Sequence, residues 1–217
     1  MSNIDLQEQE QLDALKAWWK DNSKWIITVL AVAIVGYAVM AYWKSYQGKQ
    51  AAEAATLYSE VLKQVASNDP KRINDSVAVL VSKYRGTAYA SRAQLLAVQA
   101  NVQAKDFTQA KSQLEWVIAH ASENALQDTA RLKLSSILLD EKKFDEALKL
   151  LDATHPEAFV GLYSDLKGDV LAAQGKTEDA RAAYKLALDK MDSKSSYRNL
   201  IQLKLDGLGT ASQGGAK

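Results

Sequence analysis

Two histidines, His120 and His155, are the first side chains in this sequence to consider for catalysis or metal binding. They fall near the ends of different predicted helices, and neither has a second histidine at the i, i+4 spacing of a helical metal site. A histidine near a helix C-terminus can instead bond the last carbonyl groups. The spacing favours that helix-end role. The absence of cysteine excludes thiolate zinc sites, disulfides and cysteine nucleophiles.

Phosphate binding and carboxylate chemistry are the next possibilities. The segment Gly175-Lys176-Thr177 contains the end of a phosphate-loop motif, but Val170 occupies the position of the motif's first glycine. We interpret the segment as a turn between helices. Four carboxylates cluster at a predicted helix start, where acids complement the helix dipole; they are Asp140, Glu141, Asp145 and Glu146. We therefore predict a protein that is not an enzyme and has no cofactor, metal site or small-molecule substrate.

The composition predicts an all-α protein. Apolar residues make up 47% of the 217 residues, enough for a core, and Pro70 and Pro156 are the only prolines. Alanine, leucine, lysine, glutamine and glutamate are abundant, and these residues favour helices. The net charge is +1, with about −2 in residues 1–43 and about +3 in the remainder. No clustered basic face is evident, so we do not expect nucleic-acid binding.

The second half of the sequence repeats itself. Three segments pass from lysine through a turn into a helix that opens on Ala110, Ala147 or Ala180, which lie 37 and 33 residues apart. A large residue follows each alanine by four positions. The pattern resembles the tetratricopeptide repeat, in which small residues let paired helices approach closely. The predicted repeat-packing residues are Ala110, Leu114, Ala147, Leu151, Gly168, Ala180, Tyr184 and Ala187.

The repeats are imperfect. Gly168 precedes the third alanine by twelve residues, but Val98 and Ser135 stand at that position in the earlier units, and Thr177 replaces a phenylalanine. A generic helical bundle is the alternative fold. A TPR-like α-solenoid of antiparallel helix pairs explains the repetition, which a bundle does not require.

The first half of the soluble part is helical without a visible repeat. We expect a helix from Ala51 to Ala66, a break at Ser67 to Pro70, and a second helix from Ile73 to Tyr84. A final helix from Ser195 to Leu205 is expected to cap the solenoid.

A single apolar segment near the N-terminus is long enough to cross a membrane. The residues from Trp25 to Trp43 include no charged side chain, and nineteen helical residues span roughly 28 Å. A buried core helix and a cleaved signal peptide are the alternatives. An uncleaved signal-anchor fits better, because the preceding 24 residues are long and partly acidic for a signal peptide. The predicted membrane-interface residues are Lys24, Trp25, Tyr42, Trp43 and Lys44.

The residues on either side of this segment indicate which way it crosses the membrane. Three lysines on the N-terminal side, against Lys44 and Lys49 on the other, favour a cytoplasmic N-terminus. Apolar residues before the segment recur at helical spacing, which predicts a short amphipathic helix that lies on the membrane face or docks on a partner. The predicted parts are residues 1–24, cytoplasmic; 25–43, transmembrane; 44–206, the TPR-like domain; and 207–217, a flexible tail.

Several blocks of the sequence resemble the YfgM family, the ancillary subunits of the bacterial SecYEG translocon. They are Leu15-Lys16-Ala17-Trp18-Trp19, Trp43-Lys44-Ser45-Tyr46-Gln47, Asp165-Leu166-Lys167-Gly168-Asp169, Gly175-Lys176 and Ala180-Arg181-Ala182-Ala183-Tyr184. The resemblance extends over nearly the whole chain, although from Ala51 to Gly86 only the helical pattern agrees.

This resemblance implies a single-pass inner-membrane protein with a cytoplasmic N-terminus and a periplasmic domain. It implies association with SecYEG and with PpiD, a membrane-anchored chaperone of the isomerase-like type. It further implies chaperone-like assistance to nascent secreted proteins and a link to the Rcs stress response. No catalytic residues come with it. The alternative functions are a membrane-tethered TPR scaffold for a division or cell-wall assembly, and an enzyme of unrecognised type.

Overall fold

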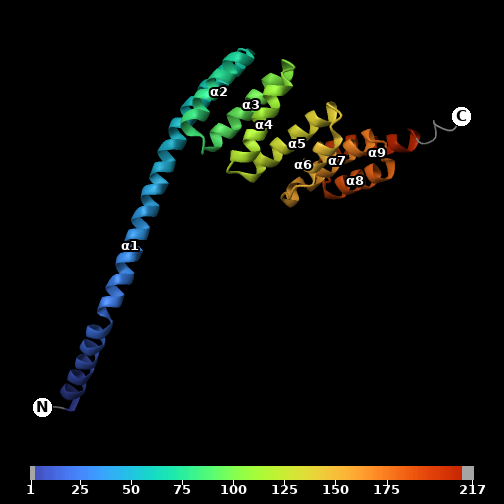
Figure 1. The fold of residues 1–217 in the computed structure, drawn as a ribbon. Helices are drawn as coiled ribbons and strands as arrows, with labels where there is room; N and C mark the ends of the chain where they lie inside the picture. Colours follow the sequence, from blue (N-terminus) through green and yellow to red (C-terminus); the bar gives the residue numbers. More distant parts are fainter. Residues whose placement is uncertain (1–2, 212–217) are drawn as a thin grey trace. The chain divides into compact units, whose positions relative to one another are not determined.

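The computed structural model of the chain describes residues 3–211. These residues form helices and no β-strand, and their contacts divide the chain after Gln50 into two compact units. The first unit is part of helix α1 (Asn3–Ala66), whose last turns belong to the second unit. Helices α2 to α9 make up the remainder of the second unit (Figure 1). The all-α prediction is confirmed over the described residues.

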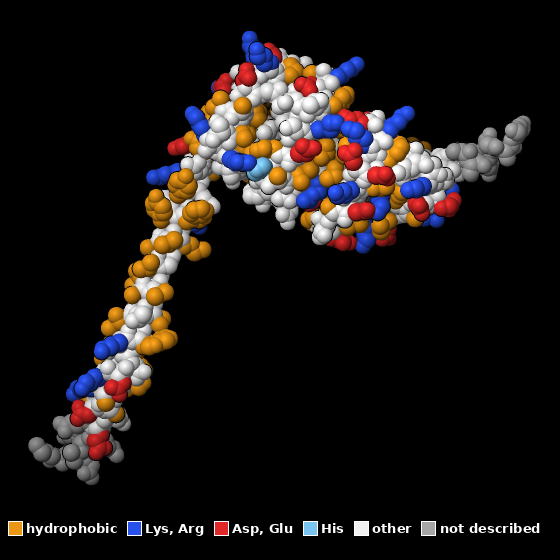
Figure 2. Space-filling view, in the orientation of Figure 1, with side chains coloured by type: hydrophobic (Ala, Val, Ile, Leu, Met, Phe, Trp, Pro, Cys, Tyr) orange, Lys and Arg blue, Asp and Glu red, His pale blue; other side chains and the backbone are white. Residues whose placement is uncertain are grey.

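Unit 1 is helical throughout its described part. We expected a separate amphipathic helix before the apolar segment, but α1 continues without a break from residue 3. No glycine or proline occurs before Gly36, so nothing in the sequence interrupts the helical hydrogen bonds. Apolar side chains gather along the middle of this helix, with charged side chains towards its N-terminal end (Figure 2).

The apolar part of α1 is long and apolar enough to cross a membrane, and none of it is buried inside the protein. A core helix of a soluble protein would bury this surface against its neighbours. The complete exposure therefore argues against the core-helix alternative. Trp25, Tyr42 and Trp43 are all exposed on this helix.

Unit 2 is a stack of antiparallel helix pairs joined by short turns. The last turns of α1 pair with α2 (Pro70–Tyr84), and α3 (Ala88–Gln103) pairs with α4 (Phe107–His120). The following pairs are α5 (Asn124–Asp140) with α6 (Phe144–Leu151), and α7 (Val160–Ala173) with α8 (Thr177–Lys190). A short 3-10 helix, η1 (Glu157–Phe159), leads into α7, and α9 (Tyr197–Ala211) packs after α8.

Three buried apolar clusters follow this order along the stack. The first joins the end of α1 to α2 and α3, the second joins α3 to α7, and the third joins α7, α8 and α9. Trp116 contacts the first two clusters and Leu148 contacts the last two, so the core is continuous from pair to pair. This chain of neighbouring contacts is typical of a solenoid.

Two element boundaries differ from the expected ones. Helix α2 begins at Pro70 rather than Ile73, because the Asp69 side chain accepts bonds from the backbone N–H groups of Lys71 and Arg72. Helix α9 continues to Ala211, so a flexible tail beginning at residue 207 is wrong for residues 207–211. Leu208 extends the apolar stripe onto the third cluster. Residues 212–217 of that tail lie outside the described part.

Candidate functional site

The same turn joins the two helices of every pair. One residue in each turn has a positive φ: 55° at Asn68, 62° at Lys105, 60° at Lys142 and 77° at Gly175. Each of these residues stands five positions before the residue that opens the repeat pattern of the second helix. Left-handed residues of this kind end helices and satisfy their last carbonyl groups. The Gly175-Lys176-Thr177 segment is therefore a helix-connecting turn.

The predicted repeat-packing residues all lie in the core. Ala110, Leu114, Ala147 and Leu151 are buried in the second cluster. Ala180, Tyr184 and Ala187 are buried in the third. A Cβ atom added to Gly168 would lie 2.5 Å from the Tyr184 ring, so α7 and α8 approach closely only because this residue has no side chain.

One repeat unit was not recognised in the sequence, although both of its helices were predicted. Ile73 stands 37 residues before Ala110, and Val77 and Leu80 follow it by four and seven residues. All three are buried with Val61 of α1, which lies twelve residues before Ile73. The sequence signal that could have revealed this unit is Asn68-Asp69-Pro70: asparagine tolerates the left-handed conformation that ends a helix, and Asp-Pro starts the next one. Isoleucine replaces the alanine of the other units, which hid the repeat.

A buried amide cluster ties α2, α3 and α4 together. Asn101, only 1% exposed, exchanges hydrogen bonds with Asn74 at 2.9 and 3.1 Å and donates to Gln113 at 2.8 Å. Gln113 in turn donates to Asn74 at 2.8 Å. Since each amide satisfies the other two, the cluster can fix how the first two pairs stack.

An ionic cluster holds α9 against α7. Lys204 lies 2.9 Å from Asp165 Oδ1 and 2.7 Å from Asp169 Oδ2, and the hydroxyls of Tyr197 and Tyr184 donate to Asp165 and Asp169 at 2.8 Å. Burial and the bond to Asp165 raise the pKa of Tyr197 to about 12. Burial acts to lower the pKa of Lys204, but Asp169 and Asp165 outweigh it, and that pKa is raised.

Three of the four carboxylates considered for chemistry have structural roles: Glu141, Asp145 and Glu146. Glu141 follows α5 and binds Lys111 at 2.5 Å and Lys143 at 2.9 Å. Hydrogen bonds from Lys111 and then Lys143 hold the pKa of Glu141 below its ordinary value. Asp145 and Glu146 lie in the first turn of α6, where they complement the helix dipole. None of these four carboxylates belongs to a potential metal-binding group among the described residues.

The two histidines lie far apart in the sequence and have different settings. His120 is the last residue of α4; its ring stacks on Trp116 at 4.7 Å, and it contacts Arg85. His155 lies in the segment between α6 and η1, and its ring stacks on Tyr163 at 4.1 Å. The structure does not bring the two together in one contact.

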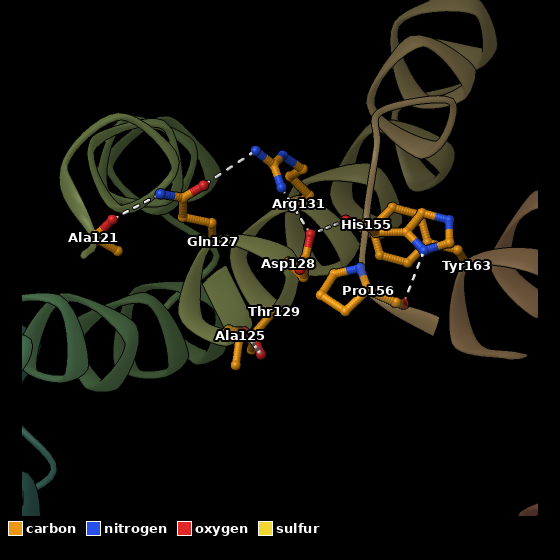
Figure 3. A network of polar contacts seen from close by, with 9 residues as sticks. All are labelled: Ala121, Ala125, Gln127, Asp128, Thr129, Arg131, His155, Pro156 and Tyr163. Carbon is orange, nitrogen blue, oxygen red and sulfur yellow. Dashed lines mark hydrogen bonds and ion pairs between the residues drawn. The ribbon is translucent and has the colours of Figure 1, made fainter. Parts of the chain in front are cut away.

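A polar pocket of about 290 Å³ lies beside this second histidine. Asp128 of α5 is 1% exposed, and its Oδ1 atom accepts from Arg131 at 2.7 Å and from Tyr163 at 2.8 Å (Figure 3). The Asp128 Oδ2 atom is buried without a hydrogen-bond partner. Burial and the bond to Asp128 raise the pKa of Tyr163. This contact therefore joins α5 to α7 through a charged network.

An apolar groove lies between α4 and α6, with α5 as its floor. Its volume is about 580 Å³, and the polar rim includes Lys111, Lys143 and Lys149. We call this hollow the α4–α6 groove. Its apolar lining consists of Ile118, Leu134, Leu138, Leu150 and Ala153. Such a surface can bind an apolar segment of another protein rather than carry out a reaction. Sequence analysis did not predict it.

Known proteins match this chain over nearly its whole length. The tetratricopeptide repeat-like domain family matches residues 16–210, which include the apolar span and all four helix pairs. The chain is 33% identical to an ancillary SecYEG translocon subunit of Neisseria gonorrhoeae, over 94% of this chain and 98% of the relative.

Two further relatives bear the same name. One, from Aggregatibacter actinomycetemcomitans, is 29% identical over 94% of this chain and 98% of its own length. The other, from Escherichia coli, is 25% identical over 93% of this chain and 96% of its own length. The matches extend across the anchor and the repeats together, and so the chain belongs to the TPR-like family of ancillary SecYEG translocon subunits.

Proposed function

We propose that this chain is an accessory subunit of the Sec translocon in the bacterial inner membrane, where it assists secreted proteins without catalysing a reaction. The carrying observation is that relatives named as ancillary SecYEG translocon subunits match 94% of the chain, anchor included. A scaffold needs both parts, since the anchor fixes the location and the helix pairs supply a binding surface.

The proposed topology places residues 1–24 in the cytoplasm, 25–43 in the membrane and 44–206 in the periplasm. Lys24 and Trp25 lie at one membrane interface in this arrangement, and Tyr42, Trp43 and Lys44 at the other. The exposed apolar surface of α1 supports the span. The lysine excess on the N-terminal side supports the direction.

The proposed partners are SecYEG, the membrane-anchored chaperone PpiD, and nascent secreted chains. The α4–α6 groove supports a chaperone-like role, because it offers an apolar surface with charged edges to a partly unfolded chain. A link to the Rcs stress response belongs to the same proposal. The engagement of the histidines and carboxylates in stacking and ion pairs supports a non-catalytic role.

Site-directed photo-crosslinking in intact membranes tests this function. Photo-reactive residues replace exposed side chains of the span and the domain, for example Tyr37 and Leu162. Adducts with SecYEG subunits, PpiD or a secreted precursor are expected. Adducts only with division or cell-wall assembly proteins would instead identify the scaffold of another envelope complex.

Protease accessibility tests the topology separately. In spheroplasts, added protease should digest the helix pairs while an epitope tag before the span stays protected. Protection of the domain until the membrane is ruptured would reverse the orientation.

A further inference from the structure

Helix α6 stops earlier than its counterparts in the other pairs. It has 8 residues, whereas α2 has 15, and α4 and α8 have 14 each. Pro156 explains the early end, because proline cannot continue the helical hydrogen bonds and it restricts the preceding residue to extended conformations. Pro156 itself is extended, with φ −63° and ψ 152°. Thr154 to Pro156 therefore form a non-helical stretch between α6 and η1, which we call the 154–156 segment.

The backbone of this segment is open to a partner. Among the described residues, no hydrogen bond involves the backbone N–H or C=O groups of Thr154 or His155. Thr154 is exposed, and stacking of the His155 ring on Tyr163 holds the segment in place. An extended stretch with free backbone groups can pair with the main chain of another extended segment, as when a peptide adds to a sheet edge.

The polar pocket beside this segment contains a buried acceptor without a donor. All three residues of the segment line the pocket together with Asp128 of α5, and Figure 3 shows His155 and Pro156 next to Asp128. The Oδ1 atom of Asp128 accepts from both Arg131 and Tyr163, whereas Oδ2 is buried and accepts from neither. A buried polar atom without a partner is unfavourable, so an N–H group that enters the pocket gains by donating to Oδ2.

The charges around the pocket favour a neutral ligand. Asp128 and Arg131 form an ion pair at 2.7 Å, and the other described lining residues include no aspartate, glutamate, lysine or arginine. An anion would be repelled by the Asp128 carboxylate, and a cation by the Arg131 guanidinium. A neutral amide avoids both: its N–H can donate to Asp128, and its C=O can accept from Arg131 or from the side-chain amide of Asn124.

We propose that this polar pocket binds the main chain of an extended segment of a secreted protein, which lies alongside the 154–156 segment. An N–H group of the bound chain donates to Asp128 and a C=O group accepts from Arg131, while the backbone of Thr154 and His155 pairs with the adjoining peptide units. This assignment rests on the proposed function and specifies a client site. The pocket volume of about 290 Å³ admits a short stretch of chain rather than a folded surface.

Main-chain recognition makes the site tolerant of client sequence. Every peptide unit supplies the same N–H and C=O groups, so affinity does not depend on a particular side-chain motif. Proline is the exception, because it has no backbone N–H to donate. We therefore expect extended segments of varied sequence to bind, provided that proline is absent from the paired positions.

A peptide whose backbone donors can be removed tests the assignment. The probe is an uncharged nonapeptide of three Ser-Val-Thr repeats, capped by a dansyl group and a C-terminal amide. Its affinity for the detergent-solubilised full-length chain is measured by fluorescence anisotropy. N-methylation of the central peptide units keeps the side chains and removes the donors, and it should lower the affinity by about tenfold. Equal affinities, or no binding of the unmethylated peptide, would overturn the assignment. Displacement of the peptide by inorganic phosphate would overturn it in favour of an anion site.

A matched pair of tryptophan variants locates the binding. Thr154→Trp places a large ring at the pocket without removing any member of the Asp128 network, and it should weaken peptide binding by about tenfold. Ala158→Trp is the control, since Ala158 is an exposed residue of η1 outside the pocket lining, and it should bind as the wild type does. Unchanged affinity of Thr154→Trp would contradict the proposal, with circular dichroism checking that both variants fold.

Photo-crosslinking separates this assignment from the wider function. The full-length chain carries a photo-reactive residue at Ala158 in membrane vesicles that are translocating a labelled precursor, and exposed Val79 of α2 is the control position. Precursor adducts from position 158 should form at several times the yield from position 79, and Thr154→Trp should reduce them to the control level. Adducts that Thr154→Trp leaves unchanged, or that form only from Val79 or Leu162, would overturn the pocket while leaving client binding intact. The absence of precursor adducts from all three positions would overturn the proposed client binding itself.

Discussion

The close approach of α7 and α8 depends on one missing side chain, at Gly168. An ideal Cβ there would lie 2.5 Å from two ring atoms of Tyr184. Because Tyr184 is 3% exposed and its hydroxyl bonds Asp169, the ring cannot easily move away. We expect Gly168→Ala to lower the free energy of unfolding by about 1–3 kcal/mol through overpacking. Chemical denaturation measures the change.

Gly86 offers the matched control for this substitution. A Cβ at Gly86 would meet no atom within 4 Å, so Gly86→Ala should leave stability nearly unchanged. Equal stabilities for the two alanine variants would show that the α7–α8 packing differs from the one described.

The buried amide cluster gives a second prediction at this scale. Replacing Asn101 by leucine removes hydrogen bonds to both Asn74 and Gln113 and leaves buried amide groups without partners. The expected loss is about 2 kcal/mol, measured by urea denaturation. Asn199, an exposed residue of α9, is the control, and its leucine variant should unfold near the wild-type midpoint. A stable Asn101→Leu protein would mean that apolar packing compensates for the lost bonds.

Small and large residues at helical spacing indicated the repeat positions around Ala110, Ala147 and Ala180, but not those around Ile73. Their energetic role remains a prediction that the Gly168 substitution addresses. The α4–α6 groove was not predictable in this way. It depends on Ile118 of α4, Leu134 of α5 and Leu150 of α6 lining one hollow, and no local pattern in the sequence specifies how residues of three different helices come together.

At the scale of elements, α9 is held by groups that titrate at alkaline pH. The pKa values of Tyr197 and Lys204 are raised in the folded protein. Their stabilising contribution is therefore fully present below their unfolded values, and it is lost as pH rises from 10 through about 12, the raised value of Tyr197. We expect the thermal midpoint to fall steeply in this window.

The Tyr197→Phe variant tests whether this ionic cluster, rather than general alkaline denaturation, causes the loss of stability at high pH. The variant should be less stable at neutral pH and should show a shallower fall above pH 10, because it has lost one of the titrating groups. Parallel profiles for the variant and the wild type would exclude Tyr197 as a source of the pH dependence.

Element boundaries were predicted where capping residues are strong and missed where tertiary contacts decide. The break at residues 67–70 was predicted from its turn residues, and the structure shows the end of α1 at Ala66 there. The predicted end of the last helix was wrong. Leu208 packs on the third cluster, and this contact stabilises the last turns of α9 although Gly207 and Gly209 flank the residue. The first helix pair escaped recognition because Ile73 replaces the small residue of the repeat pattern.

At the scale of the whole molecule, location and binding depend on different units. Val35 lies near the middle of the proposed span, and an arginine there costs about 3 kcal/mol of insertion free energy. We expect Val35→Arg to shift much of the chain from the membrane pellet to the soluble fraction after alkaline carbonate extraction. Leu203→Arg, at an exposed position of α9, should stay in the pellet. Full membrane retention of Val35→Arg would contradict the proposed span.

The short α6 has a consequence for how the domain comes apart. In a stack where each pair contacts only its neighbours, cooperativity passes along the chain of interfaces and breaks at the weakest one. Helix α6 has 8 residues, whereas α4 and α8, the second helices of the pairs on either side, have 14 each. The pair that contains α6 is therefore the weak point. Native-state hydrogen exchange should show α6 amides opening at lower free energy than those of α4 or α8. Uniform protection across all three helices would contradict this. The domain should accordingly behave as two half-stacks joined by a hinge of low stability.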